Sequence, residues 1–193
     1  MYIDRILAPI ETLGPGRRLV IWTKGCTKHC PHCANPELWD TAAAKEYSVS
    51  DIVTIIRNVY RETKFDGITI SGGDPLEQKE DILTLLERVQ DLTEDILVYT
   101  GYTLEELERL WTEDEIRRLK QYISVLIDGP YIDTQNETDV VLRGSANQRI
   151  LYFKEKQKDA YEVYLSEGRK IQNVMMGDKL ISVGIHNRKG ECS

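Results

Sequence analysis

Short apolar runs alternate with amphipathic segments through the first two thirds of the chain. Four of the runs have the length and composition of buried strands, and they span 19–23, 67–71, 96–100 and 123–127. The segments between them place apolar residues at helical spacing, as at Ile52, Ile55, Ile56 and Val59 and again at Ile82, Leu85, Leu86 and Val89. This order of strands and helices predicts a sheet of parallel strands.

Three helix starts are predicted from capping patterns, in which Ser or Thr is followed three residues later by an acidic residue. The pairs are Ser48 and Asp51, Thr103 and Glu106, and Thr112 and Glu115. In such a parallel sheet, the ligand site lies at the carboxyl ends of the strands. We therefore expect the loops that begin near residues 24, 72, 101 and 128 to converge on one face.

The pattern changes after residue 128, where a stretch rich in Gly, Pro, Asp and Asn runs to about residue 146. Strands are predicted at 149–153, 161–165, 170–176 and 179–185, the last two joined by Gly177 and Asp178 in a tight hairpin. No linker divides the chain. We expect residues 1–153 to form the main domain and residues 154–193 to form an antiparallel β-hairpin extension packed on or beside it.

Composition and charge restrict the class of protein. The 193 residues include 25 Lys and Arg against 32 Asp and Glu, a formal net charge of −7, so the surface repels nucleic acid and anionic membranes. No apolar run approaches the ~18 residues of a membrane span, and the first fifteen residues lack the features of a secretory signal. We expect a cytoplasmic protein that binds neither nucleic acid nor membrane.

Three cysteines lie within eight residues directly after the first predicted strand, in the pattern Cys-x3-Cys-x2-Cys: Cys26, Cys30 and Cys33. In a reducing compartment, clustered thiols indicate metal or redox chemistry more than disulfides. A loop of this length can place three thiolates around one metal ion or cluster.

The spacing of the thiols leaves two kinds of centre open. Structural zinc needs a fourth protein ligand, for which His29 or His32 is the nearby candidate. A cubane iron–sulfur cluster normally takes four cysteines, so three would leave one iron open to an exogenous ligand. Cys192, next to last in the chain, is expected to be a tail thiol and not a ligand.

The cysteine pattern, followed after the second strand by Ser-Gly-Gly-Asp-Pro at 71–75, resembles the radical S-adenosylmethionine (SAM) superfamily. The resemblance implies that Cys26, Cys30 and Cys33 hold a [4Fe-4S] cluster whose fourth iron binds SAM. It also implies a partial, open TIM-type βα barrel of parallel strands. The SAM contacts that it implies are His32, Cys33, Ala34, Gly72, Gly73 and Asp74, with Asp74 where many members carry Glu.

Asp128 is a further candidate SAM contact, because it ends the fourth strand at the edge where α/β sheets bind ligands. The alternative is a turn aspartate before Gly-Pro. The side chains of residues 143–148 are not expected to be catalytic, since they could order the crossover loop through hydrogen bonds to the backbone.

Three later segments narrow the resemblance. Tyr-Thr-Gly-Tyr at 99–102, Asp-Gly-Pro at 128–130 and Arg-Gly-Ser-Ala-Asn-Gln at 143–148 are similar to glycyl-radical activating enzymes, and specifically to the family that activates anaerobic (class III) ribonucleotide reductase. The similarity covers roughly residues 5–153.

This resemblance implies an oxidoreductase that cleaves SAM reductively at its cluster and generates a glycyl radical on anaerobic ribonucleotide reductase. Flavodoxin or ferredoxin is the kind of electron donor implied, and no catalytic residue is expected beyond the cluster.

Two alternatives remain. The first is radical SAM chemistry on a different protein or peptide. The second is a non-catalytic module that binds zinc through three cysteines and one histidine.

Overall fold

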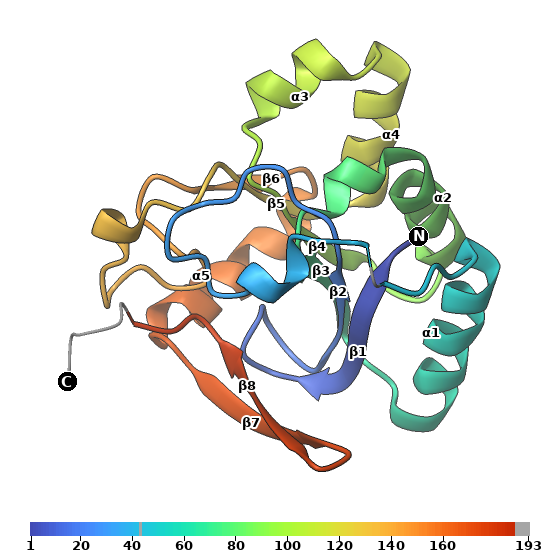
Figure 1. The fold of residues 1–193 in the computed structure, drawn as a ribbon, viewed down its shortest axis with the longest axis horizontal. Helices are drawn as coiled ribbons and strands as arrows, with labels where there is room; N and C mark the ends of the chain where they lie inside the picture. The colour runs from blue at the N-terminus through green and yellow to red at the C-terminus, as the bar shows by residue number, and fades with distance from the viewer. Residues whose placement is uncertain (43, 188–193) are drawn as a thin grey trace.

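The computed structural model describes residues 1–42 and 44–187 and has a six-stranded sheet at its centre, in the order β1-β2-β3-β4-β5-β6 (Figure 1). The strands are β1 (Ile3–Ile10), β2 (Arg18–Thr23), β3 (Gly67–Gly72), β4 (Asp95–Tyr99), β5 (Val125–Asp128) and β6 (Arg149–Tyr152). The four middle strands are parallel, and β1 and β6 pair antiparallel at the two edges. The mainly parallel sheet is confirmed, whereas a TIM-type barrel is not.

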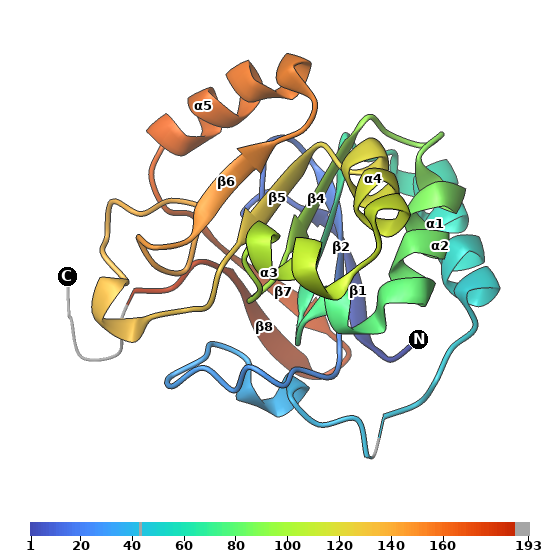
Figure 2. The same ribbon diagram turned by 90° about the horizontal axis from the view of Figure 1, so that it is seen from above.

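Helices cover one face of this sheet (Figure 2). They are α1 (Val49–Thr63), α2 (Lys79–Val89), α3 (Leu104–Leu110) and α4 (Glu113–Tyr122). Apolar side chains from all four join those of β2 to β5 in one buried cluster. The side chains of Ser48, Thr103 and Thr112 cap α1, α3 and α4 as predicted. In the described ranges, no helix is long and apolar enough to cross a membrane.

Two parts of the fold differ from the sequence-based expectation. β1 was not predicted, because the charged Asp4 and Arg5 and the imide of Pro9 interrupt its apolar pattern; an edge strand tolerates such residues. The strand expected at 161–165 is wrong, since these residues belong to helix α5 (Lys158–Ser166). Tyr161 and Tyr164 are spaced three apart, and both pack on the sheet face opposite α1 and α2.

The predicted hairpin at the end of the chain is confirmed as β7 (Ile171–Met176) and β8 (Lys179–Gly184), which form a separate antiparallel sheet. Its turn contains Gly177 with a φ of +63°. Val183 is buried in a cluster with Ile10, Val20 and Trp22 of β1 and β2. The hairpin therefore packs on the same sheet face as α5.

Single-turn 3-10 helices complete the fold in the connections. They are η1 (Pro36–Leu38), η2 (Pro75–Gln78), η3 (Asp133–Gln135) and η4 (Glu155–Gln157).

A fully buried charge lies near the amino-terminal ends of the parallel strands. The Arg18 guanidinium forms an ion pair with Asp95 and donates to Thr69 Oγ1 (2.6 Å). Asp95 also accepts hydrogen bonds from Ser124 Oγ (2.7 Å) and from the Tyr161 hydroxyl (2.8 Å). These five side chains come from β2 to β4, from the residue before β5 and from α5, so the network ties α5 to the sheet.

We expect Asp95→Asn to destabilise the fold by about 3–5 kcal/mol, because it leaves the buried Arg18 guanidinium without a counter-charge. Asp91→Asn is the matched control, since Asp91 forms an exposed ion pair with Arg57 and such pairs contribute at most about 1 kcal/mol. Urea denaturation followed by circular dichroism measures both. Equal losses in the two variants would show that the Arg18 network does not hold the sheet together.

Candidate functional site

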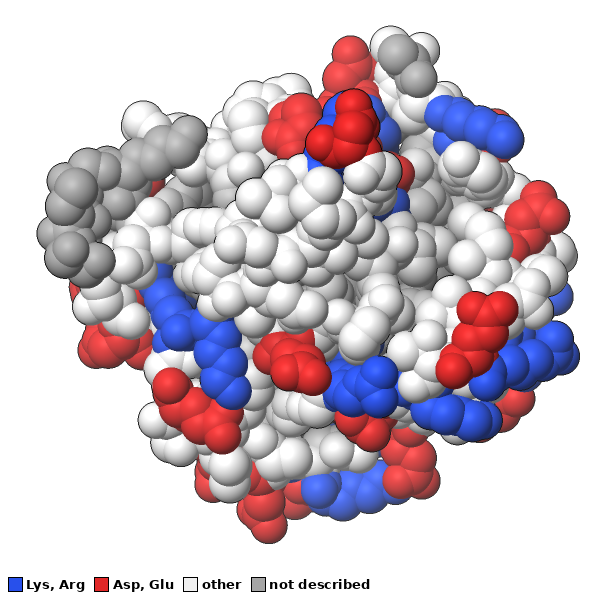
Figure 3. All heavy atoms as spheres, turned by 90° about the horizontal axis from the view of Figure 1, so that it is seen from below, with Lys and Arg blue, Asp and Glu red and all other residues white. Residues whose placement is uncertain are grey.

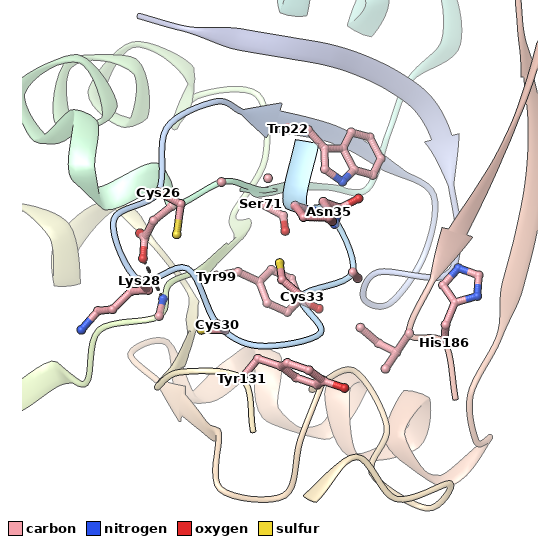
Figure 4. Close-up of a pocket in the computed structure, with 18 of the residues that line it drawn as sticks. Trp22, Cys26, Lys28, Cys30, Cys33, Asn35, Ser71, Tyr99, Tyr131 and His186 are labelled. Carbon is pink, nitrogen blue, oxygen red and sulfur yellow. Dashed lines mark hydrogen bonds between the residues drawn. The ribbon is translucent and has the colours of Figure 1, made fainter. Parts of the chain in front are cut away.

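The loops at the carboxyl ends of the parallel strands converge, as predicted, on one cavity of about 930 Å³ (Figure 4). This volume lies within the range of roughly 300–1,000 Å³ that is usual for small-molecule sites. Its walls come from the cysteine loop after β2, the glycine turn after β3, the start of the loop after β4, the long connection from β5 to β6, and residues 182–187 at the end of the hairpin.

The three predicted cysteines all line this cavity. Cys26, Cys30 and Cys33 are free thiols and partly buried, and the sulfur atoms of Cys26 and Cys33 lie on the inner side of the loop (Figure 4). Burial raises the pKa of the Cys26 thiol to about 11, against the opposing effect of backbone hydrogen bonds from Lys28 and His29. Within the described part of the chain, no three His, Cys, Asp or Glu side chains are close enough together to hold a metal ion.

The cysteine loop is fixed at its start by backbone hydrogen bonds and farther along by side chains. Gly25 and Cys26 donate their backbone N–H groups to the carbonyls of Leu38 and Trp39 (2.8 and 3.1 Å). Thr27 donates both its N–H and its hydroxyl to Glu77 (2.7 and 2.6 Å), which lies on η2.

Lys28 extends the attachment of the loop to α3. Its ammonium lies 3.9 Å from the centroid of the Tyr102 ring and 3.4 Å from the Glu106 carboxylate.

The glycine turn approaches the cysteine loop as closely as two backbones can. Gly73 donates its N–H to the Thr23 carbonyl (2.8 Å), and Asp74 donates to the Gly25 carbonyl (2.7 Å). A Cβ atom at Gly73 would lie 2.3 Å from that Gly25 oxygen, so no other residue fits there. Gly72 has a φ of +120°, which also requires glycine.

Asp74 lines the cavity but is almost completely buried. Its carboxylate accepts hydrogen bonds from Thr100 Oγ1 (2.9 Å), Gly101 N (2.8 Å) and Leu76 N (3.1 Å). Burial raises the pKa of Asp74 to about 6, while these hydrogen bonds act in the opposite direction. The side chain thus joins the end of β3 to the loop after β4.

Of the other predicted SAM contacts, His32 and Ala34 line the cavity and Asp128 does not. His32 and Ala34 are exposed at its mouth. His29 is stacked on Trp39 at 4.7 Å and does not line the cavity.

Asp128 is fully buried outside the cavity lining. Its carboxylate forms an ion pair with Arg149 of β6 and accepts the Leu104 N–H (2.8 Å). In this structure, Asp128 therefore holds β5, β6 and α3 together.

The polar side chains of residues 143–148 order the connection from β5 to β6 through hydrogen bonds to the backbone, as the sequence suggested. Gln148 accepts the N–H groups of Gly144 and Ser145 (2.8 and 3.2 Å) and donates to the Gly129 carbonyl (2.9 Å). Asn147 donates to the Pro130 carbonyl (2.8 Å). This connection then forms one wall of the cavity.

Two groups of lining residues were missed by sequence reasoning. Arg5 of β1 lies over the Trp22 ring at 4.9 Å, with Asn35 Oδ1 3.4 Å from its guanidinium. Its strand was not predicted, so no sequence signal placed Arg5 here. The second group is Ser182 to Asn187, whose place in the wall follows from the packing of the hairpin and not from any local motif.

The donor set fits an iron–sulfur cluster, whose cysteines each bind a different iron atom and so need not be close enough together to hold one ion. Three thiols on one loop are soft ligands of the kind that such clusters take. The backbone N–H groups of Lys28 and His29 bond the Cys26 sulfur and would stabilise its thiolate form. Of the two histidines considered as a fourth zinc ligand, His32 lines the cavity with the thiols and His29 does not.

Known proteins support the same conclusion. Residues 12–151 match the model of a family described as 4Fe-4S single cluster domain. The anaerobic ribonucleoside-triphosphate reductase-activating protein of Haemophilus influenzae is 37% identical over 147 residues, which cover 73% of this chain and 91% of the relative. The proteins of the same name from Vibrio cholerae and Escherichia coli are 35% and 32% identical, over 75% and 74% of this chain and 94% and 93% of their own length.

These matches confirm the resemblance on which the enzyme class was predicted, a radical SAM activating enzyme with an iron–sulfur cluster. The chain belongs to the 4Fe-4S single cluster domain family and to the family of anaerobic ribonucleoside-triphosphate reductase-activating proteins.

Proposed function

We propose that the chain binds a [4Fe-4S] cluster through Cys26, Cys30 and Cys33, cleaves SAM there and activates anaerobic ribonucleotide reductase. The observation that carries the proposal is the placement of the three thiols and the Gly72–Gly73 turn on one cavity large enough for SAM. When bound and reduced by a one-electron donor such as flavodoxin or ferredoxin, the cluster would split SAM into methionine and a 5′-deoxyadenosyl radical that removes a hydrogen atom from a glycine of the reductase.

The residues of the chain would orient SAM for this step. Gly72 and Gly73 line the cavity with backbone alone, and this backbone would hold the methionyl end of SAM. His32 and Ala34 at the mouth would border the adenosine. Asp74 would act by holding the glycine turn in position, because its carboxylate already accepts hydrogen bonds from Thr100, Gly101 and Leu76.

The cavity suits a reaction that must exclude water yet admit part of another protein. Apolar and aromatic side chains, among them Trp22, Tyr99 and Tyr131, contribute to its walls. Because the sequence relatives are named as activators of anaerobic ribonucleoside-triphosphate reductase, that reductase is the partner that we propose.

Replacing any one of the three loop cysteines by alanine is expected to abolish SAM cleavage, because two thiolates cannot hold the cluster in a position open to SAM. Protein reconstituted anaerobically with iron and sulfide is reduced with dithionite, and 5′-deoxyadenosine is measured after SAM is added. Cys192→Ala is the matched control and should retain full activity. A colourless, zinc-loaded wild-type protein that leaves SAM intact would contradict the proposal.

Gly73→Ala is expected to lower 5′-deoxyadenosine formation by about a hundredfold, because the new Cβ would meet the Gly25 carbonyl at 2.3 Å and push the cysteine loop away from the turn. Gly101→Ala tests the same kind of change beside the flexible Lys28 side chain, at 3.1 Å, and should reduce the rate by less than about threefold. Similar losses in both variants would argue against a fixed spacing of loop and turn.

A further inference from the structure

The hairpin at the end of the chain has two faces of different character. One face packs on the sheet through Val174, Ile181 and Val183. Because side chains alternate along a strand, the other face carries Ile171 and Met175 of β7, with Leu180 opposite Met175. Met175 and Leu180 are neighbours across the hairpin and are 62% and 65% exposed, while Ile171, 47% exposed, lies farther along the same face beyond the pair of Asn173 and Ser182.

This exposed face continues into the mouth of the cavity. Asn173 and Ser182 pair across the hairpin on the same face, and Ser182 also lines the cavity. Figure 3 shows the molecule from below the view of Figure 1, the side on which the hairpin lies. Uncharged atoms form a broad central area there, and charged side chains lie mainly around it. A protein that covers the mouth of the cavity would therefore also contact the exposed face of the hairpin.

The hairpin is a fixed border of the cavity. The Val183 carbonyl accepts the Thr12 hydroxyl (3.0 Å), and the His186 carbonyl accepts from Asn136 (3.2 Å) and Arg169 (3.1 Å). These bonds connect the hairpin to the loop after β1 on one side and to the connection from β5 to β6 on the other. The family match ends at residue 151, so this border lies outside the part of the chain that the family shares.

We propose that Ile171, Met175 and Leu180, here named the hairpin platform, are the docking surface for the protein whose glycine enters the cavity. The proposal rests on the proposed function. Hydrogen abstraction requires contact between the glycine α-carbon and a group deep in the cavity, so the flanking parts of that protein must cover the mouth and its borders. An apolar surface around a glycine-containing loop is the chemistry that fits the platform, and the flexible Met175 can adapt to it.

The test compares Leu180→Glu with Leu110→Glu in the full-length, cluster-loaded protein. Both leucines are 65% exposed, and Leu110, the last residue of α3, does not line the cavity. Anaerobic ribonucleotide reductase from the same organism is the probe. The glycyl radical is measured by electron paramagnetic resonance over a series of reductase concentrations, and 5′-deoxyadenosine is measured without reductase.

Leu180→Glu should raise the reductase concentration for half-maximal radical formation about tenfold or more, as expected when a central apolar contact is lost. Met175→Glu should do the same, Leu110→Glu should match the wild type, and 5′-deoxyadenosine formed without reductase should not change in any variant.

Three results would overturn the docking proposal and leave the proposed function intact. The first is the same half-maximal reductase concentration for Leu180→Glu and Leu110→Glu, and the second is loss of reductase-free SAM cleavage in Leu180→Glu. The third is a wild-type dimer that Leu180→Glu converts to a monomer while the half-maximal reductase concentration stays unchanged. The last would make the platform a contact between copies of this chain. A wild-type protein that cleaves no SAM would overturn the proposed function itself.

Discussion

The geometry of the site depends on the close approach of two backbones at the ends of β2 and β3. The Gly25 carbonyl lies where a side chain of residue 73 would begin, and the glycine turn donates two backbone hydrogen bonds across this contact, to the carbonyls of Thr23 and Gly25. Because the contact is made between backbones, the positions of the thiols and of the glycine turn are set by the register of two parallel strands. The cysteine loop is in this sense an extension of the sheet.

On the sheet face opposite α1 to α4, the two ends of the strands have different structures. At the amino-terminal end of the parallel strands, Arg18, Asp95 and Tyr161 form a buried and well-paired network that α5 covers. At the carboxyl end, the strands open into the cavity, whose walls include backbone and neutral side chains. The buried Arg18 network holds the strands together at their amino-terminal ends, so the loops at the carboxyl ends can surround a cavity for a ligand.

The sequence predicted those parts of the fold whose signals are local. Capping residues such as Thr103 and Thr112 bind their own helix starts, and the apolar runs of the parallel strands are buried on both sides. β1 and α5 have ambiguous local patterns, and packing against the sheet decides their structure.

The same distinction applies to the site. The thiols and the glycine turn follow from loop positions after β2 and β3. The carboxylate of Asp128 was expected near the ligand, but it pairs with Arg149, 21 residues further along the chain and on another strand. The wall formed by Ser182 to Asn187 comes from a segment more than 140 residues after the cysteine loop. No local pattern encodes such contacts, because they arise only when distant elements pack together.

The position of the hairpin separates chemistry from recognition. The thiols, the glycine turn and the connection that orders the far wall all lie within residues 12–151, the part shared with the family. The hairpin is added outside this part and touches the cavity only at its border, while Gln172 binds the backbone of Pro9 and Glu11 at the end of β1. A border attached in this way can change which protein surface fits the mouth without moving the loop that would hold the cluster. The extension is therefore placed where it can alter the choice of partner at little cost to the reaction.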